Sequence, residues 1–244
     1  MFTKSSQYYD ALYHFKDYKA AAVQLRSLIQ AHNPNAKTLL DVGCGTGQHL
    51  AVLKDFYRVE GLDINPDLLQ VARRRCPNVR FHERDMVGFE LGSTYDAVSC
   101  LFSSIGYVKS LERMEKAMTS MARHLKPGAM LVVEPWLTPE AYWVGRITAN
   151  FVDQPELKIA WMYTSELQDR VSVFDINYLV GTPQGVSHFV ERHEMGLFTH
   201  EEYLRAFQKA GLNVSYDAKG LFGRGMYIGR KGTAQRPAQA PGDN

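Results

Sequence analysis

The stretch from Thr38 to Gly47, TLLDVGCGTG, limits the possible folds more than any other part of the chain. Apolar and β-branched residues surround Asp41, glycines follow at Gly43, Gly45 and Gly47, and a helical pattern then begins. This order predicts a buried strand, a tight turn and a helix start. Glycines allow positive φ and a close approach of backbone to ligand, and the free N–H groups of the new helix would face that ligand. A turn of this kind is the ligand-binding device of doubly wound α/β folds.

The spacing of the glycines separates this turn from two better-known phosphate loops. It is G-x-G-x-G, which is neither the dinucleotide fingerprint nor a P-loop. The next apolar run, YRVEGLD, ends at Asp63, close to the distance at which such folds place the acid that binds a ribose. A glycine turn in some other Rossmann-like protein is the alternative that these residues leave open.

At these positions the chain resembles the class I S-adenosylmethionine-dependent methyltransferases, whose first motif has the form LDVGCGTG. The resemblance implies S-adenosyl-L-methionine as cofactor and S-adenosyl-L-homocysteine as product. It places the glycine loop under the methionine part, Asp63 at the ribose hydroxyls and Ile64 beside the adenine. The residues expected at the cofactor are Tyr18, Asp41, Gly43, Cys44, Gly45, Gly47, Asp63, Ile64, Asp85, Met86 and Leu101.

Length and composition limit the remaining possibilities. The 244 residues suffice for one α/β domain with an insertion, and a net charge of +2 gives no case for nucleic-acid binding. Cys44, Cys76 and Cys100 fit neither a disulfide framework nor a zinc site, so we expect a reduced, cytoplasmic setting and no metal. No apolar run has membrane-spanning length. We expect one domain over 1–232 and a disordered tail over 233–244, whose sequence is TAQRPAQAPGDN.

Strands and helices alternate through the first half of the chain, which predicts a mostly parallel sheet with one antiparallel strand at the end. The second half differs, because residues 137–198 indicate an inserted antiparallel layer. Thr199 with Glu202 has the pattern of a capping box, so a helix should follow and end at Ala210-Gly211. The expected strands are 38–42, 57–63, 78–82, 95–101, 130–134, 158–167, 170–181, 186–198, 212–216 and 226–228.

The N-terminal residues are rich in tyrosine and precede a helix expected from Asp17 to Asn33. For Tyr13 and Tyr18 two interpretations stay open. Either these rings pack the helix onto the sheet, or they form a lid over the cofactor pocket, since both roles use aromatic side chains.

Other segments bear on the methyl acceptor. DNA and glutamine N-methyltransferases of this fold carry [DN]-P-P-[YF] after the fourth strand, where this chain has LFSSIGYV. The segments FSSIGY, VVEPW, HF at 188–189 and GRGMYIG, with the opening YYDALY, resemble the bacterial N,N-dimethyltransferases of nucleotide-linked 3-amino-deoxysugars (desosamine and mycaminose type) in antibiotic biosynthesis. The segment after Trp136 lacks the second aromatic residue of that group. The alternatives are an N- or O-methyltransferase of another small metabolite, or a cofactor-binding protein without catalysis.

The resemblance implies a dTDP-linked aminosugar as substrate, with no nucleic-acid or membrane partner and a homodimer as one expected state. We assign catalytic roles to Tyr107, Glu134 and His188, with His193 as a second histidine able to accept a proton. Each could instead be structural, because strand histidines and strand-end acids often are. The residues expected at the substrate are Tyr13, Ser103, Ser104, Trp136 and Arg224, of which Arg224 would hold the diphosphate.

Overall fold

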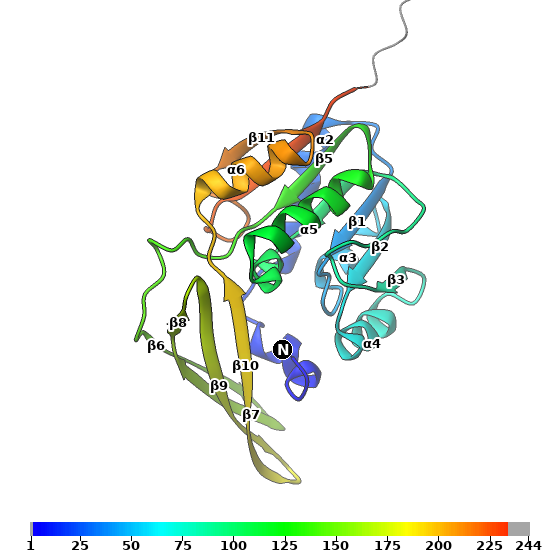
Figure 1. The fold of residues 1–244 in the computed structure, drawn as a ribbon. Helices are drawn as coiled ribbons and strands as arrows, with labels where there is room; N and C mark the ends of the chain where they lie inside the picture. Colours follow the sequence, from blue (N-terminus) through cyan, green and yellow to red (C-terminus); the bar gives the residue numbers. More distant parts are fainter. Residues whose placement is uncertain (1, 234–244) are drawn as a thin grey trace, which may run out of the picture.

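A seven-stranded sheet forms the centre of the fold in the computed structural model, which describes residues 2–233 (Figure 1). Its strand order is β11-β12-β5-β4-β1-β2-β3. All neighbouring strands are parallel except at β12, which is antiparallel to both β5 and β11. The strands are β1 Thr38–Val42, β2 Arg58–Asp63, β3 Arg80–Glu83, β4 Tyr95–Cys100, β5 Leu125–Val133, β11 Leu212–Asp217 and β12 Met226–Lys231. The mostly parallel sheet and its closing hairpin are therefore confirmed.

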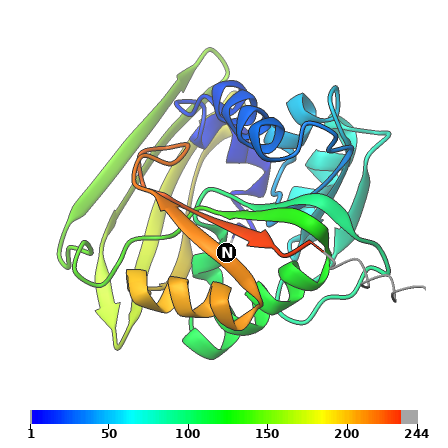
Figure 2. The same cartoon turned by 90° about the horizontal axis from the view of Figure 1, so that it is seen from above.

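Helices cover both faces of this sheet, as the view from above shows (Figure 2). Met114, Met118 and Phe207 pack one face, and Leu25 and Leu69 pack the other. These methionines are thus part of the core, and alternate residues of β1 supply the two faces. The helices are α2 Tyr18–His32, α3 Gln48–Leu53, α4 Pro66–Arg75, α5 Leu111–Arg123 and α6 His200–Lys209.

The helix starts follow from their capping residues. Asp17 accepts a hydrogen bond from Ala20 N at 2.8 Å, which fixes the start of α2. Thr199 and Glu202 form the expected capping box at α6. The strand expected over 130–134 starts earlier than predicted. Strand β5 already begins at Leu125, which pairs with Tyr95 before a shift of register.

A second, antiparallel sheet is inserted between β5 and α6 (Figure 1). The insertion was predicted, but as three strands, whereas five are present. The strand over 147–154 went unnoticed because its polar residues Thr148 and Asn150 line a cavity while Ile147 and Phe151 face outward. The strands are β6 Ile147–Gln154, β7 Leu157–Thr164, β8 Glu166–Gln168, β9 Val171–Thr182 and β10 Gly185–Gly196.

The N-terminal segment lies between the two sheets (Figure 1). It contains a short 3₁₀ turn, η1 Ser6–Tyr8, and α1 Tyr9–Leu12. Glu191 of β10 accepts a hydrogen bond from Ser5 N at 3.1 Å and another from Ser5 Oγ, which ties this segment to the second sheet. None of the helices in residues 2–233 is long and apolar enough to span a membrane. The tail expected over 233–244 lies outside the described residues except for Thr233.

Candidate active site

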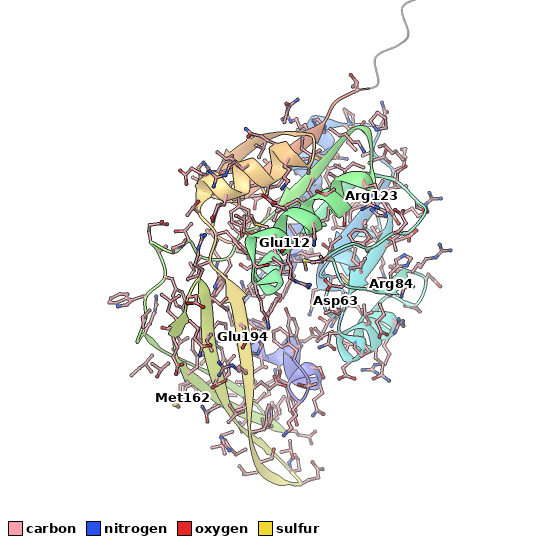
Figure 3. The ribbon with its side chains drawn as sticks, viewed as in Figure 1. Asp63, Arg84, Glu112, Arg123, Met162 and Glu194 are labelled. Atoms are coloured by element: carbon pink, nitrogen blue, oxygen red, sulfur yellow. The ribbon has the colours of Figure 1, made fainter. Side chains whose placement is uncertain are left out.

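A cavity of about 400 Å³ lies between the carboxyl ends of the first sheet and the inner face of the second. The N-terminal segment contributes Tyr13 to its wall, and the first sheet contributes Asp63. Figure 3 shows Asp63 on the side of the first sheet that faces the second. Parallel α/β sheets bind ligands at this end, where the order of the strands reverses around β1. Of the predicted residues, Tyr13, Gly43, Gly45, Asp63, Ile64, Asp85, Met86, Ser103, Ser104, Tyr107, Trp136 and Arg224 line this cavity.

The glycine loop has the backbone shape that its sequence indicated. Gly43, Gly45 and Gly47 have φ of 71°, 54° and 74°, values that side-chain-bearing residues rarely adopt. A Cβ on Gly43 would lie 2.6 Å from the Cβ of Ser104, whereas a Cβ on Gly45 would meet nothing within 4 Å. The loop is therefore packed against Ser104 on one side and open to a ligand at Gly45.

Asp63 stands at the end of β2 and is buried. Its Oδ2 accepts a hydrogen bond from Gly45 N at 2.8 Å, and its Oδ1 accepts one from Asn65 N at 2.9 Å. Burial raises the pKa of this carboxyl, and the backbone N–H groups of Asn65, Gly45 and Ile64 oppose that rise. A carboxylate offers about four acceptor positions, so the two oxygens keep room for a hydroxyl of a ribose.

The expected adenine end is open to solvent. Ile64 is 50% exposed although it is apolar, and Met86 lies beside it on the cavity wall. Asp85 already accepts hydrogen bonds from Arg113 Nη2 at 2.8 Å and from Val87 N at 2.9 Å. A bound adenine ring would cover the apolar surface of Ile64, which would explain why this side chain is exposed without a ligand.

A smaller hollow of about 30 Å³ adjoins the main cavity. Gly43, Gly45 and Phe102 are among the residues that line both. Asp41 lies in this hollow, accepts a hydrogen bond from Ser99 Oγ at 2.7 Å, and has its pKa raised to about 7 by burial. Tyr18, Cys44 and Leu101 also line the hollow, whereas Gly47 lines neither space and starts α3.

Arg224 enters the cavity from the loop before β12. Its Nη1 donates a hydrogen bond to Ser103 Oγ at 3.1 Å, and the guanidinium lies 5.0 Å from the Trp136 ring centroid. Ser103 Oγ also donates to the Pro135 carbonyl at 2.8 Å. These contacts hold the guanidinium over an aromatic ring in the cavity wall.

The three predicted catalytic residues have different positions. Tyr107 lines the cavity, and its hydroxyl lies 3.0 Å from Nδ1 of His193. Glu134 is buried outside the cavity wall and accepts hydrogen bonds from Phe102 N at 2.9 Å and Leu221 N at 3.2 Å, so it orders the adjoining loops. His188 is exposed on β10, with its Nε2 3.2 Å from Asn177 Oδ1, and lines no cavity.

His193 takes the place in the cavity wall that His188 lacks. Residues 189, 191, 193 and 195 of β10 face the interior, so His188 faces the opposite side of the sheet. Burial is the main cause that lowers the pKa of His193 to about 4. The ring is therefore neutral near pH 7.

Lys16 was not predicted as a site residue, because a lysine beside the helix cap Asp17 is typical of a solvent-exposed position. It lines the cavity, with its Nζ 3.4 Å from the Phe102 ring centroid and 4.4 Å from that of Phe222. Burial, with the nearby charge of Arg224, lowers the pKa of Lys16 to about 8, and Glu134 opposes both causes. Thr148, Asn150, Trp161 and Tyr163 of the second sheet were also missed, because no local motif marks them.

Within residues 2–233, no three His, Cys, Asp or Glu side chains lie close enough together to hold a metal ion. The described part of the chain does fit a nucleoside that carries an amino-acid chain. Gly45 leaves its backbone open, Asp63 keeps free acceptor positions, and buried polar atoms of Tyr18 and His49 face the smaller hollow without a partner.

The strand order, the glycine loop after β1 and the acid at the end of β2 together define the Rossmann-like class I methyltransferase fold. Comparison with known proteins gives the same class, since residues 39–128 match the family described as a methyltransferase domain.

Longer relatives narrow the family. A dTDP-3-amino-3,6-dideoxy-α-D-glucopyranose N,N-dimethyltransferase of Streptomyces fradiae is 40% identical over 89% of this chain and 86% of its own. A dTDP-4-amino-2,3,4,6-tetradeoxy-D-glucose N,N-dimethyltransferase of Saccharopolyspora spinosa is 34% identical over 91% of this chain and 90% of its own. The S-adenosylmethionine-bound structure of an amino pentose methyltransferase from Micromonospora echinaspora, involved in calicheamicin biosynthesis, superimposes with a TM-score of 0.84 at 36% identity, covering 95% of this chain and 98% of that one. The chain belongs to the S-adenosylmethionine-dependent methyltransferases, in the family of these amino-sugar enzymes.

Proposed function

We propose that the protein transfers two methyl groups to the amine of a dTDP-linked 3-amino-deoxysugar. The observation that carries this proposal is one cavity with two different parts. The glycine loop and Asp63 line one part of the cavity, and Arg224 lies over the Trp136 ring in the other. A nucleoside with an amino-acid chain suits the first part, and an acceptor with an anionic diphosphate suits the second.

The residues act mainly by positioning. S-adenosylmethionine supplies an activated methyl group on its sulfonium. The carboxylate of Asp63 would hold the ribose hydroxyls, and the glycine loop would support the methionine part. Arg224 would hold the diphosphate of the acceptor through paired N–H donors. Fixing both reactants in one orientation supplies a large share of the lowering of the barrier.

The described site favours an acceptor that arrives as the neutral amine. His193 has a pKa near 4, so it is too weak a base to take a proton from an alkylammonium near pH 7. The pKa of Tyr107 is raised by burial, so its hydroxyl stays protonated and can only donate to or accept from a ligand. Solvent that reaches the cavity mouth would then carry away the proton released on methylation.

The position of the amine is the finer part of this proposal. The relative from Streptomyces fradiae bears the name of a 3-amino sugar, and that from Saccharopolyspora spinosa bears the name of a 4-amino sugar. The higher identity to the first supports the 3-amino assignment. Two alternatives are methylation of another small metabolite and cofactor binding without catalysis. The same assay tests both.

The test is methyl transfer followed by mass spectrometry. The protein is incubated with S-adenosylmethionine and, in separate reactions, with a dTDP-3-amino-deoxysugar, a dTDP-4-amino-deoxysugar and the free 3-aminosugar. We expect sequential gain of two methyl groups on the first, with slower reaction of the other two. No methylation of any nucleotide-linked aminosugar, or equal rates with the free sugar, would contradict the proposal.

We further propose that the protein acts as a homodimer through the outer face of its second sheet. Ile147, Phe151 and Met162 are apolar and 76%, 62% and 46% exposed on this face. Figure 3 shows Met162 on the side of the second sheet away from Asp63. The rim carries paired charges of both signs, Lys158 with Asp153 and Arg192 with Asp175. A face with an apolar centre and both signs at its rim can pair with its own copy about a two-fold axis.

The reduced, cytoplasmic setting also stays part of the proposal. It is supported by the three cysteines, which are free and buried.

A further inference from the structure

Buried polar atoms without partners mark the walls of the two cavities. In residues 2–233 such side-chain atoms occur on seven residues, and four of these residues line one of the cavities. Folded proteins rarely leave buried polar atoms unpaired, because the lost hydrogen bond to water is costly. Unpaired atoms that gather at cavity walls therefore indicate positions where a ligand supplies the partner. The four residues are Tyr18, His49, Trp161 and His193.

His49 is the most informative of them. It lies in the first turn of α3, two residues after Gly47, is only 6% exposed, and lines the smaller hollow. Its Nε2 makes no hydrogen bond, and its ring packs against Tyr18 and Phe222 at centroid distances of 5.1 and 6.1 Å. Burial lowers the pKa of His49 to about 4, and the charge of Lys16 adds to this. Near pH 7 the neutral ring can carry its proton on Nε2 and donate it.

Tyr18 adds a second donor to the same hollow. Its hydroxyl is buried beside that of Tyr9 but makes no hydrogen bond of normal geometry. Burial raises the pKa of Tyr18, so the hydroxyl keeps its proton. The hollow thus presents two neutral donors that the fold leaves unused.

The charges around the hollow would orient an amino-acid group bound in it. The ammonium of Lys16 lies near His49 and over the Phe102 and Phe222 rings, and the charges of Arg224 and Glu134 also act on it. Asp41 lines the same hollow, and Asp63 accepts a hydrogen bond from Gly45 N of the glycine loop. An amino-acid end bears a carboxylate and an ammonium on one carbon, and this polarity orients the carboxylate toward Lys16 and His49.

We propose that His49 binds the α-carboxylate of the cofactor's methionine end, together with the Tyr18 hydroxyl and the Lys16 ammonium. Three donors suit a carboxylate, whose oxygens only accept hydrogen bonds. The inference deepens the cofactor site of the family and does not depend on which acceptor is methylated.

The test compares two ligands that differ only at the amino-acid end. Isothermal titration calorimetry measures the affinity for S-adenosylhomocysteine and for 5′-methylthioadenosine, which keeps the adenosine and sulfur but lacks the amino acid. His49→Phe preserves ring packing and removes Nε2. We expect about tenfold or greater loss of affinity for S-adenosylhomocysteine and an unchanged affinity for 5′-methylthioadenosine. Tyr18→Phe and Lys16→Met should show the same selectivity, and His49→Gln, which keeps a donor, should recover part of the loss.

Tyr57→Phe is the matched control, because the Tyr57 hydroxyl is also buried and unpaired but Tyr57 lines neither cavity. It should change neither affinity. Unchanged affinity for S-adenosylhomocysteine in the His49 and Tyr18 variants would overturn the proposal, as would an equal loss for both ligands. Failure of the wild-type protein to bind either ligand would instead contradict the cofactor itself, and failure to methylate an aminosugar would leave these affinities as they are.

Discussion

Replacing Arg224 with alanine should weaken binding of the nucleotide-linked acceptor without disturbing the cofactor. The guanidinium already rests 5.0 Å from the Trp136 ring centroid and donates to Ser103 Oγ, so little side-chain freedom is lost when a diphosphate binds. Ser103 keeps its hydrogen bond to the Pro135 carbonyl in the variant, so no buried donor is left unpaired there. The change therefore reports on the ligand more than on the fold.

The size of the effect follows from the kind of contact. A charge-assisted hydrogen bond contributes about 1.5–3 kcal/mol, which corresponds to roughly a tenfold to hundredfold change in affinity. The diphosphate is remote from the transferred methyl group, so KM should rise on this scale while kcat changes little. Because Arg224 lowers the pKa of Lys16 from its side of the cavity, the pKa of Lys16 should rise above about 8 in the variant.

The assay is steady-state kinetics with a dTDP-3-amino-deoxysugar, with calorimetry of S-adenosylhomocysteine beside it. Arg224→Lys should recover only part of the affinity, because an ammonium is a point charge without the planar fork. Arg230→Ala, on β12 and outside both cavities, is the matched control. The reasoning fails if KM for the nucleotide-linked sugar is unchanged, or if the free aminosugar reacts as well as the nucleotide-linked one.

Four further predictions concern other parts of the molecule. Asp63→Ala should weaken S-adenosylhomocysteine binding in calorimetry through loss of an acceptor for two hydroxyls, whereas Asp67→Ala on α4 should not; equal affinities in both variants would refute the Asp63 assignment. Activity should persist in a chelator, and a loss that added magnesium restores would count against the amine acceptor. Phe151→Lys with Met162→Lys should turn a dimer into a monomer in sedimentation velocity, while Val23→Lys on α2 should not; a wild-type monomer would refute the dimer. The free energy of unfolding, measured with urea, should fall by on the order of 3 kcal/mol from pH 7 to pH 4. The unfolded chain protonates His49 and His193 near pH 6.5, whereas the folded chain does so only near pH 4, and the raised pKa of Asp41 opposes this loss in part. A flat pH profile, or one that His49→Phe does not flatten, would contradict the prediction.

Most of the first sheet could be predicted because its signals are local. Each strand is a short apolar run bounded by turn residues, and the loop at Gly43 to Gly47 needs positive φ that only glycine adopts readily. The capping box at Thr199 is likewise complete within four residues. In β6 the usual alternation is inverted, since Thr148 faces the cavity and Phe151 faces outward. A pattern search that expects apolar residues inside passes over such a strand.

The cofactor end could be located from the sequence because its residues follow directly from strands that share one edge of the sheet. Lys16 and Trp161 reach the same cavity from a segment before β1 and from an inserted strand. Their proximity depends on how the N-terminal segment and the second sheet close over the first, through contacts such as that of Glu191 with Ser5. Contacts between residues so distant in the chain produce no periodic hydrophobic pattern in either segment, so the sequence does not predict them.

The two histidines of β10 show that predicting a strand does not predict which of its side chains face the cavity. Its alternation puts His188 and His193 on opposite faces, because five residues is an odd number of steps. The sequence could not say which face is inside, since Val186 and Val190 make the outer face as apolar as many inner ones. The choice is made by pairing with β9, whose inward Phe174 stacks on His193 at a centroid distance of 5.5 Å, and by Tyr107 from the first sheet. If the outer face binds a second copy of the chain, its apolar residues are also under selection for burial, and the ambiguity follows from the dimer that we propose.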